Sequence, residues 1–284
     1  KMKQWSMRIS AFADRLLRGL DTLDWPEPLK EMQRNWIGKS VGASVRFCVE
    51  NSHRKIEVFT TRPDTLFGVT FLTLAPEHEW VSEMTTAEQK IEVDAYVKQA
   101  AQRSERERMS EVDRISGVFT GAYALHPITN EKIPIWIGDY VLAGYGTGAV
   151  MAVPCGDQRD FAFATHFNLP IKNIFKDVDI STTAHTAKEN TIMANSDFID
   201  GLSIPEATQK VIAVLDEIGM GEGATTFRLR EAVFSRQRYW GEPIPVYYVN
   251  EQPQLVPDEC LPLELPEVSK YLPTADGAPP LGNA

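Results

Sequence analysis

The sequence predicts an α/β protein whose strand-rich central domain, about 42–226, lies between helical or irregular flanks. Segments 43–49 and 55–60 ("ASVRFCV" and "KIEVFT") alternate apolar and polar residues around a polar turn, which is the pattern of a β-hairpin. Segment 204–219 ("IPEATQKVIAVLDEIG") has apolar residues at helical spacing and ends at a glycine. With 43% hydrophobic and 10% aromatic residues in 284, the chain can bury a core of this kind.

The remaining elements follow from the same two periodicities. Helices are expected where apolar residues recur every three or four positions, at 1–20, 27–38, 86–102, 157–167 and 231–240. Strands are expected in alternating runs bounded by Gly or Pro, at 69–75, 117–125, 132–138 and 147–154. Segment 170–200 is only loosely patterned, and the Pro-rich tail after 250 has weak strand signals.

This pattern predicts three parts: an N-terminal helical stem at 1–41, a central domain at 42–226 and a C-terminal stem at 227–284. The two stems lack enough apolar residues for cores of their own. The chain begins "KMKQWSMRIS", without an initiator Met or an apolar signal core, so we expect an internal cut from a longer protein. A strand-rich domain between two such ends is typical of a domain that is inserted in a larger protein and has been cut out together with the stems that attach it.

The composition limits the cellular compartment and the classes of binding partner that are expected. No apolar run is long enough for a membrane helix, so no membrane partner is expected. The cysteines Cys48, Cys155 and Cys260 are far apart, which fits a reducing cytoplasm and offers no zinc spacing. A net charge of -10 argues against a generic nucleic-acid-coating surface, so any RNA contact must be local.

Two basic clusters stand out against this acidic background. The first alternates with glutamates and predicts a solvated helix face; its members are Arg103, Arg106, Arg108 and Arg114. The second lies close to Tyr239 and Trp240 and is the better candidate for an interaction surface; its members are Arg228, Arg230, Arg236 and Arg238.

Familiar catalytic motifs are missing. The glycines of 144–148 run into a strand-like segment, whereas a dinucleotide fingerprint requires a helix there, and neither GxxxxGK[ST] nor GxSxG occurs. The five histidines show no metal-ligand spacing, and no cysteine has an evident histidine partner. Phosphoryl transfer, metal catalysis and covalent acyl transfer therefore lack their usual residues.

Two segments concentrate polar side chains beside conformationally permissive residues. "TTRPDTLFG" (60–68) follows a predicted strand, and "YGTGAVMAVPCGDQRD" (145–160) ends where a helix is expected to begin. Together they indicate a small pocket of hydroxyls, backbone amides and carboxylates. Such a pocket can orient water against an ester and stabilise the oxyanion.

Two carboxylates in the second segment are candidates for charge recognition. Asp157 and Asp160 are three residues apart at the helix start, where the helix dipole favours ionised carboxylates that bind a cation such as an ammonium. More ordinary roles are a helix N-cap for Asp157 and, for Asp160, a salt bridge to Arg159 or Arg62.

In combination these segments resemble leucyl-tRNA synthetase. "TTRPDTLFG" is similar to the threonine-rich signature of the hydrolytic editing domain of leucyl, isoleucyl and valyl synthetases, and "YGTGAVMAVPCGDQRDFAFA" resembles their second signature. "MQRNWIGKSVGA" (32–43) and "FSRQRYWGEPIPVYY" (234–248) resemble the stems that join this domain to the class I catalytic domain, and "QRNWIGKS" favours the leucyl enzyme. The HIGH-type and KMSKS-type motifs are absent, so the resemblance implies an editing fragment that does not aminoacylate.

The resemblance implies a β-barrel-like core with surrounding helices, and a role for each site residue. The wall near the ester and the terminal ribose would comprise Thr60, Thr61 and Arg62. Thr65 would exclude leucine, Met151 and Val153 would line the side-chain pocket, and Tyr145 would lie near the terminal adenosine. Asp160, supported by Asp157 and Arg159, would anchor the amino group of the aminoacyl moiety.

The implied reaction is attack of water on the ester carbonyl, without a metal or a covalent intermediate. No side chain is an evident general base, so the adjacent ribose hydroxyl is the candidate assistant. Many family members have a histidine immediately before "DQRD", where this chain has Gly156, so a histidine there is not essential here. We do not expect Cys155 to replace it as a nucleophile.

The expected substrate is the 3′ terminal adenosine of tRNA-Leu carrying a noncognate leucine isostere. Such editing is needed because binding alone separates side chains differing by a methylene by only about 1–3 kcal/mol. We expect a cytoplasmic monomer joined to the rest of the synthetase, with no cofactor for editing, since ATP and Mg would serve only the missing catalytic domain. The alternatives are the editing domain of an isoleucyl or valyl synthetase, and a non-catalytic module that binds the tRNA end.

Overall fold

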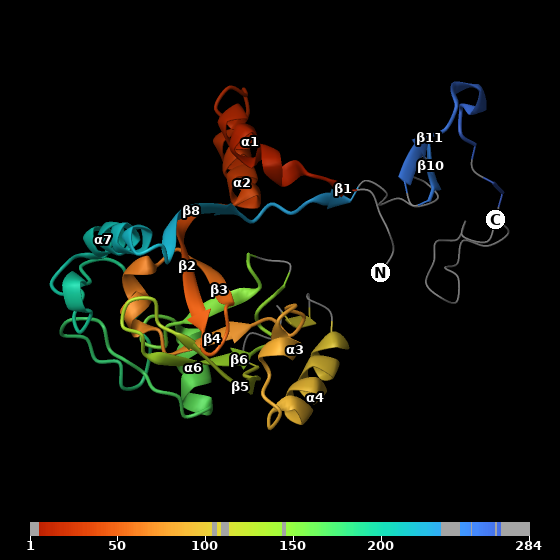
Figure 1. The fold of residues 1–284 in the computed structure, drawn as a ribbon. Coiled ribbons are helices and arrows are strands. Elements are labelled where there is room, and N and C mark those ends of the chain that lie inside the picture. Colours follow the sequence, from red (N-terminus) through yellow and green to blue (C-terminus); the bar gives the residue numbers. More distant parts are fainter. Residues whose placement is uncertain are drawn as a thin grey trace. The chain divides into compact units, whose positions relative to one another are not determined.

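The chain divides into two compact units in the computed structural model (Figure 1). One unit is continuous, Lys39–Arg228, and the other combines Lys1–Gly38 with Leu229–Ala284. The residues that the structure describes are 6–103, 107–108, 114–143, 146–233, 245–250, 252–264 and 266–267.

The continuous unit is built on a seven-stranded mixed sheet. Its hydrogen-bonded order is β3-β2-β5-β6-β4-β7, and β8 pairs with β2. β4 and β6 are parallel, and the other paired neighbours are antiparallel. The strands are β2 (Lys39–Val49), β3 (Lys55–Thr60), β4 (Phe71–Leu74), β5 (Val118–Leu125), β6 (Lys132–Ile137), β7 (Ala149–Ala152) and β8 (Gly221–Phe227).

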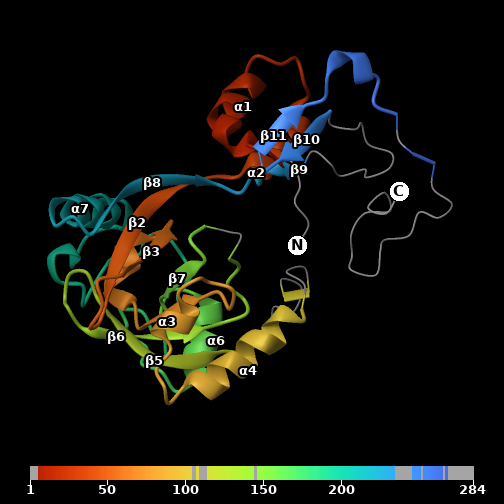
Figure 2. The same ribbon diagram turned by 45° about the vertical axis from the view of Figure 1, so that its right-hand side comes forward.

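Helices and short 3-10 turns connect and cover these strands. Helix α7 begins with a capping box between Ser203 and Glu206, ends before Gly219 (φ +67°), and lies beside β8 (Figure 2). It also contacts η2, the turn that follows β3. The elements are η2 (Pro63–Gly68), α3 (Val81–Met84), α4 (Lys90–Ala101), α6 (Gln158–His166), η3 (Asp197–Ile199) and α7 (Ile204–Glu217).

The sheet confirms the mixed α/β class, but the expected barrel-like closure is not found among the described residues. The ladder ends at β3 on one side and at β7 on the other, without hydrogen bonds between these strands. The chain after β7 is unsuited to further pairing, because the Val153 N–H donates to the Asp160 carboxylate and Pro154 has no N–H to donate.

A second, smaller apolar cluster lies beneath α6. Phe163 of this helix stacks on Phe71 of β4, with ring centroids 4.9 Å apart, and both side chains are buried. Phe71 pairs across the sheet with Ala152 of β7. The helix and β7 are thereby packed on one another, which places the first turn of α6 close to the end of the strand.

Segment 170–200 is ordered by core contacts and by hydrogen bonds to the start of α6. Its core residues Ile174, Phe175, Met193 and Ile199 are all buried, and Phe175 forms an isolated β-bridge with Met193. The Gln158 side-chain oxygen accepts hydrogen bonds from the Thr183 hydroxyl and the Ala184 N–H. The segment therefore belongs to the continuous unit despite its weak pattern.

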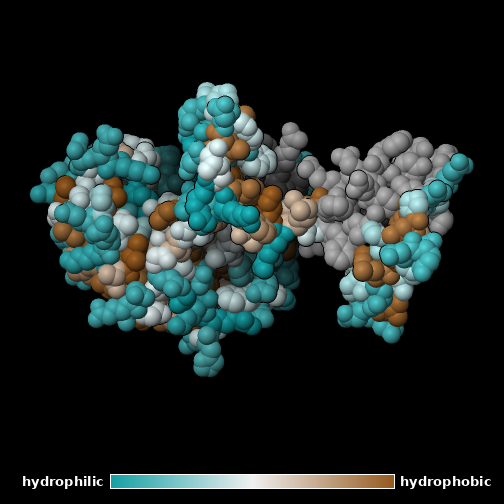
Figure 3. Space-filling model, turned by 90° about the horizontal axis from the view of Figure 1, so that it is seen from above, coloured by the Kyte–Doolittle hydropathy of each residue, from teal (hydrophilic) through white to brown (hydrophobic). Residues whose placement is uncertain are grey.

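The second unit contains a pair of helices and several short strands and turns. Strands β1 and β9 pair antiparallel, as do β10 and β11. Several apolar side chains of this unit are exposed, among them Trp36 (71%) and Leu255 (78%), and Figure 3 shows hydrophobic surface on the β10–β11 segment at the right of the view. The elements are β1 (Ser6–Met7), η1 (Ile9–Phe12), α1 (Ala13–Leu20), α2 (Glu27–Ile37), β9 (Ala232–Val233), β10 (Val246–Val249), β11 (Gln252–Leu255) and η5 (Asp258–Cys260).

Three local predictions were wrong. The helix expected at 231–240 starts as a strand, since Ala232–Val233 pairs with β1, and 234–240 lies outside the described residues. β8 was missed because its glycines indicate turns; a Cβ on Gly221 would lie 2.4 Å from the Ser44 carbonyl oxygen, so glycine permits the pairing with β2. Arg108 is buried rather than solvated, because its guanidinium donates to the backbone carbonyls of Asp139 and Val141.

Candidate functional site

The threonine-rich turn directly after β3 forms one wall of a small cavity. Thr60 ends the strand, and its hydroxyl oxygen accepts the Arg62 N–H at 3.0 Å. Gly42 of β2 lies against this point, where a Cβ would be 1.9 Å from the Thr60 carbonyl oxygen. The backbone at Thr60 and Thr61 can therefore take this position only because the neighbouring strand carries no side chain there.

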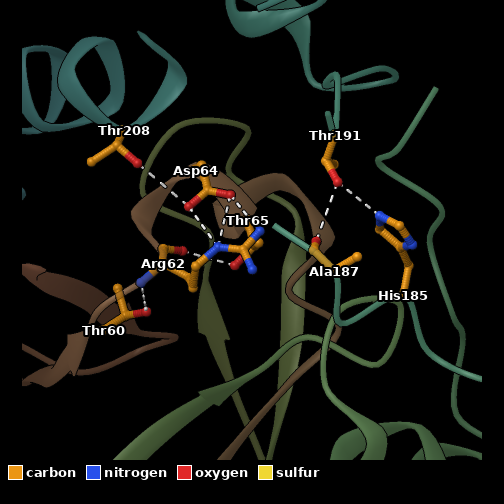
Figure 4. A network of polar contacts seen from close by, with 8 residues as sticks. All are labelled: Thr60, Arg62, Asp64, Thr65, His185, Ala187, Thr191 and Thr208. Carbon is orange, nitrogen blue, oxygen red and sulfur yellow. Dashed lines mark hydrogen bonds and ion pairs between the residues drawn. The ribbon is translucent and has the colours of Figure 1, made fainter. Parts of the chain in front are cut away.

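The turn is held in shape by a buried ion pair. Asp64 is completely buried and accepts bonds from Arg62, with Nε–Oδ1 at 3.0 Å and Nη2–Oδ2 at 2.8 Å. The Thr208 hydroxyl of α7 approaches the same carboxylate at 3.5 Å, and Figure 4 shows the three side chains converging. Asp64 thus fixes the guanidinium of Arg62 and stabilises the turn.

Thr65 faces the cavity from within this turn. Its side-chain hydroxyl donates to the Arg62 carbonyl oxygen at 2.8 Å, and its backbone N–H bonds to the same oxygen at 3.1 Å (Figure 4). Only 3% of Thr65 is exposed. Because the hydroxyl proton is used inside the turn, Thr65 contributes volume to the cavity more than a hydrogen-bond donor.

The opposite wall comes from β7 and the start of α6. Asp157 is the N-cap of α6, because its carboxylate accepts the N–H groups of Arg159 at 2.9 Å and Asp160 at 3.0 Å. This confirms the more ordinary role considered for Asp157. One Asp160 oxygen accepts the Val153 N–H at 2.8 Å and so links the helix to the strand end.

Asp160 differs from expectation in its charge state. Burial raises its pKa to about 7 and the charge of Asp157 acts in the same direction, whereas the Val153 N–H and the Arg159 charge oppose them. The helix dipole was expected to keep this carboxylate ionised, but desolvation outweighs it. The considered salt bridge is also absent from the described residues, since Arg62 pairs with Asp64 and Arg159 lies over the Tyr140 ring.

The two walls enclose a cavity of about 200 Å³. Both sequence segments contribute to it, although they are more than eighty residues apart in the sequence. Its lining consists of Thr60, Thr61, Arg62, Thr65, Met151, Val153, Gly156, Asp157 and Asp160. The structure therefore brings together eight of the ten residues singled out from the sequence.

The other two residues differ in their placement. Tyr145 lies outside the described residues. Arg159 is on α6 but lines a different cavity of about 360 Å³, where its guanidinium carbon is 5.5 Å from the centre of the Tyr140 ring. Its contribution to Asp160 is thus its charge, which lowers the carboxyl pKa, and not a contact in the same cavity.

Cys155 is unsuited to act as a nucleophile. Its side chain is completely buried and does not line the cavity, and burial raises the pKa of the thiol to about 11. The adjacent Gly156 does line the cavity, and a Cβ there would make only ordinary contacts, the nearest at 3.5 Å to Phe175. A methyl group at position 156 would fit sterically, so the glycine is not required by the backbone.

Sequence reasoning missed Gly42 and Thr208 as supports of the site. The sequence predicted this strand only from residue 43 onwards, whereas it begins at Lys39 and includes Gly42. A glycine inside an alternating strand is the signal that could have indicated a close backbone approach. Thr208 gives no such signal, because its contact with Asp64 depends on how α7 packs on η2.

Neither a metal centre nor a membrane-spanning helix is found within the described residues. Within the described residues, His, Cys, Asp and Glu side chains do not gather in groups of three or more that could ligate a metal ion. The described helices also include none with the length and apolar character needed to cross a membrane.

Comparison with known proteins places this geometry in a family. Residues 34–216 match the family model for "Leucyl-tRNA synthetase, editing domain". The chain is 66% identical over its whole length to the leucine–tRNA ligase of Christiangramia forsetii and 65% identical to that of Flavobacterium johnsoniae. It spans about 30% of the length of these relatives.

A solved structure is similar as well. The "ternary complex of Agrobacterium radiobacter K84 agnB2 LeuRS-tRNA-LeuAMS" aligns with a TM-score of 0.75 and 38% identity, over 91% of this chain and 29% of that one. The resemblance seen in the two signatures is therefore confirmed. Because the matching model covers more than half of its residues, this chain belongs to the leucyl-tRNA synthetase editing-domain family.

Proposed function

We propose that the chain hydrolyses the ester between a noncognate amino acid and the 3′ terminal adenosine of tRNA-Leu, and that it spares Leu-tRNA. The observation that carries this proposal is the convergence of Thr65 and Asp160 on one cavity of about 200 Å³. This volume is below the range of about 300–1,000 Å³ found for drug-sized ligands. It suits an aminoacyl group better than a whole nucleotide.

Asp160 is the proposed anchor for the α-ammonium group. Its raised pKa, about 7, means that the empty site holds the carboxyl group in both protonation states near neutral pH. A bound ammonium would favour the ionised state, because an opposite charge nearby lowers the pKa of a carboxyl group. Binding would thereby replace an unfavourable isolated charge with a buried ion pair.

Thr65 is the proposed steric gate. Its buried position and its internal hydrogen bond to the Arg62 carbonyl hold the side chain in one place. A fixed wall can discriminate by volume, and one methylene in such a pocket changes binding by about 1–3 kcal/mol. Met151 and Val153 supply the apolar remainder of the pocket, and both are nearly fully buried.

Thr60, Thr61 and Arg62 are the proposed groups next to the ester. The Thr60 oxygen accepts the Arg62 N–H, which leaves the hydroxyl proton as a donor towards a substrate oxygen. Arg62 adds positive charge where an oxyanion would develop, and Asp64 holds its guanidinium. Water is the attacking group, and the ribose hydroxyl adjacent to the ester is the proposed assistant.

The proposed partners are the end of tRNA-Leu and the remainder of a leucine–tRNA ligase. The relatives that the chain matches are leucine–tRNA ligases more than three times its length, and the similar Agrobacterium structure contains tRNA. No cofactor is proposed for editing, and ATP and Mg are assigned to the catalytic part of such an enzyme. The cytoplasmic location and the monomeric state stay predictions.

Deacylation assays test the proposal. A full-length leucine–tRNA ligase with this chain as its editing segment is mixed with isoleucyl-, valyl- and leucyl-tRNA-Leu, and release of each amino acid is followed. We expect the first two to be hydrolysed and the third to survive. Binding of tRNA without hydrolysis would indicate a non-catalytic module. Valyl-tRNA-Ile is tested alongside, and its preferential hydrolysis would indicate an isoleucyl-type specificity.

A further inference from the structure

We propose that His126 is a positioning residue for the cavity: its Nε2–H bond to the Leu66 carbonyl holds the η2 turn, and thereby sets where Thr65 stands. His126 follows β5 in the sequence and lies sixty residues from Leu66. It does not line the cavity. The inference rests on the proposed function, because it assigns a determinant of the same discrimination.

The hydrogen-bond partners of His126 define its tautomer. The Nδ1 atom lies 3.2 Å from the N–H of Ile128 and 3.1 Å from that of Thr129, so Nδ1 accepts from both. The proton of the neutral ring is therefore on Nε2, which donates to the Leu66 oxygen at 3.0 Å. Each ring nitrogen then has a partner of the correct type.

The surroundings keep His126 neutral. It is 2% exposed and contacts the rings of Phe47 and Phe67, at centroid distances of 6.4 and 5.8 Å. Burial lowers its pKa and the charge of Lys172 acts in the same direction, whereas the Leu66 carbonyl and Glu131 oppose them. A second proton on Nδ1 would also face two N–H donors, which would disfavour the charged ring further.

The turn needs an anchor of this kind. It is a 3-10 segment, whose internal hydrogen bonds are weaker than those of an α-helix. The Leu66 oxygen accepts one bond within the turn, from the Val69 N–H at 3.1 Å, and the His126 bond is the second. Thr65 precedes Leu66 directly, so any shift of this carbonyl also moves the gate.

The test compares two substitutions that differ in one hydrogen bond. His126→Phe keeps an aromatic ring but removes the donor, whereas His126→Gln retains an N–H near the place of Nε2. Both are assayed on isoleucyl- and leucyl-tRNA-Leu in the same full-length ligase. His53, exposed in the turn between β2 and β3, provides the matched control His53→Phe.

We expect His126→Phe to raise the rate of hydrolysis of leucyl-tRNA-Leu relative to that of isoleucyl-tRNA-Leu by about 10-fold or more. This is the size of the discrimination that one methylene group provides in a rigid pocket. Both variants lose the Nδ1 acceptor of the Ile128 and Thr129 N–H groups, so His126→Gln should lie between His126→Phe and the unsubstituted enzyme, and His53→Phe should equal the unsubstituted enzyme. Equal behaviour of the Phe and Gln variants, whether both are intact or both impaired, would overturn the inference. If the unsubstituted enzyme hydrolyses no mischarged tRNA, the proposed function itself fails.

Discussion

The two walls of the cavity are built on different physical principles. In the threonine-rich wall the buried polar groups are paired with one another: Asp64 with Arg62, and the Thr65 hydroxyl with the Arg62 carbonyl. The wall formed by β7 and α6 carries Asp160, which has no cationic partner within the described residues and a pKa raised to about 7. The buried polar groups of the threonine-rich wall thus have hydrogen-bond partners without a ligand, whereas the Asp160 carboxylate of the other wall has no counter-charge among the same residues.

This difference suggests a division of labour. A wall whose hydrogen bonds are complete keeps its shape when a ligand enters, and can therefore discriminate by volume. A half-buried carboxyl group without a counter-charge gains most from a cationic ligand, and can therefore supply affinity for the ammonium that every aminoacyl group shares. The predictions below separate the two contributions.

Removal of the charge should have the largest effect. Asp160→Ala should reduce hydrolysis of isoleucyl-tRNA-Leu about 100-fold or more, because loss of one partner of a buried charge pair costs about 2–5 kcal/mol. Deacylation kinetics in the full-length ligase provide the measurement. Asp216→Ala, at an exposed position of α7, is the control. Near-normal activity of the Asp160 variant would show that the wall formed by β7 and α6 does not act by recognising the charge of the ligand.

A smaller side chain in the threonine-rich wall should change the substrate specificity and retain the hydrolytic activity. Thr65→Ala should increase hydrolysis of leucyl-tRNA-Leu about 10–200-fold by removing volume from the fixed wall. Thr70→Ala is the matched control, since Thr70 is 4% exposed and does not line the cavity. If leucyl-tRNA-Leu survives the Thr65 variant, the gate lies elsewhere.

The threonine-rich wall also depends on a strand that contributes nothing to the cavity lining. Gly42→Ala should displace Thr60 and Thr61, because the new Cβ would lie 1.9 Å from the Thr60 carbonyl oxygen. We expect a stability loss of about 1–3 kcal/mol in urea unfolding, together with slower hydrolysis. Gly223→Ala on the partner strand β8 should be tolerated, since its Cβ would be 3.7 Å from the nearest atom. Equal effects of both variants would contradict this explanation.

Because of Asp160 in the wall formed by β7 and α6, we expect the stability of the fold to fall as the pH rises. The pKa of Asp160 is raised from 3.8 to about 7, so its contribution to stability is full below pH 3.8 and is lost as the pH rises through 7. Asp160→Asn removes this loss while it can still accept the Val153 N–H. Urea unfolding should show the variant about 1–2 kcal/mol more stable at pH 8, a value reduced for the partial exposure of the group. The difference should shrink towards pH 4, and a difference independent of pH would refute the prediction.

The smallest effect is expected at Cys155. Cys155→Ser should change the rate of deacylation by less than about threefold, because a buried thiol with a raised pKa is a poor nucleophile. Single-turnover assays under conditions where the enzyme stays folded provide the check. A loss comparable to that of Asp160→Ala would instead assign covalent chemistry to the β7–α6 wall.

Much of the fold could be predicted from local pattern. The hairpin of β2 and β3, the strands β4 to β7 and the helices α6 and α7 all coincide with the periodic segments that indicated them. Residues Gly221–Phe227 could not be recognised as a strand, because "GEGATTF" has no alternation and its pairing with β2 depends on glycine at the close contact with Ser44. The absence of pairing between the edge strands β3 and β7 could likewise not be predicted, since it depends on where β7 stops pairing.

The site divides in the same way. The residue types along the chain specify where hydroxyls, charge and conformational freedom occur, and the two signatures indicate the family. The raised pKa of Asp160, the pairing of Arg62 with Asp64 and the placement of Arg159 outside the cavity arise from the packing of the folded chain. The reason is physical: desolvation and partner choice depend on what surrounds a group in space, and neighbours in the sequence do not specify those surroundings.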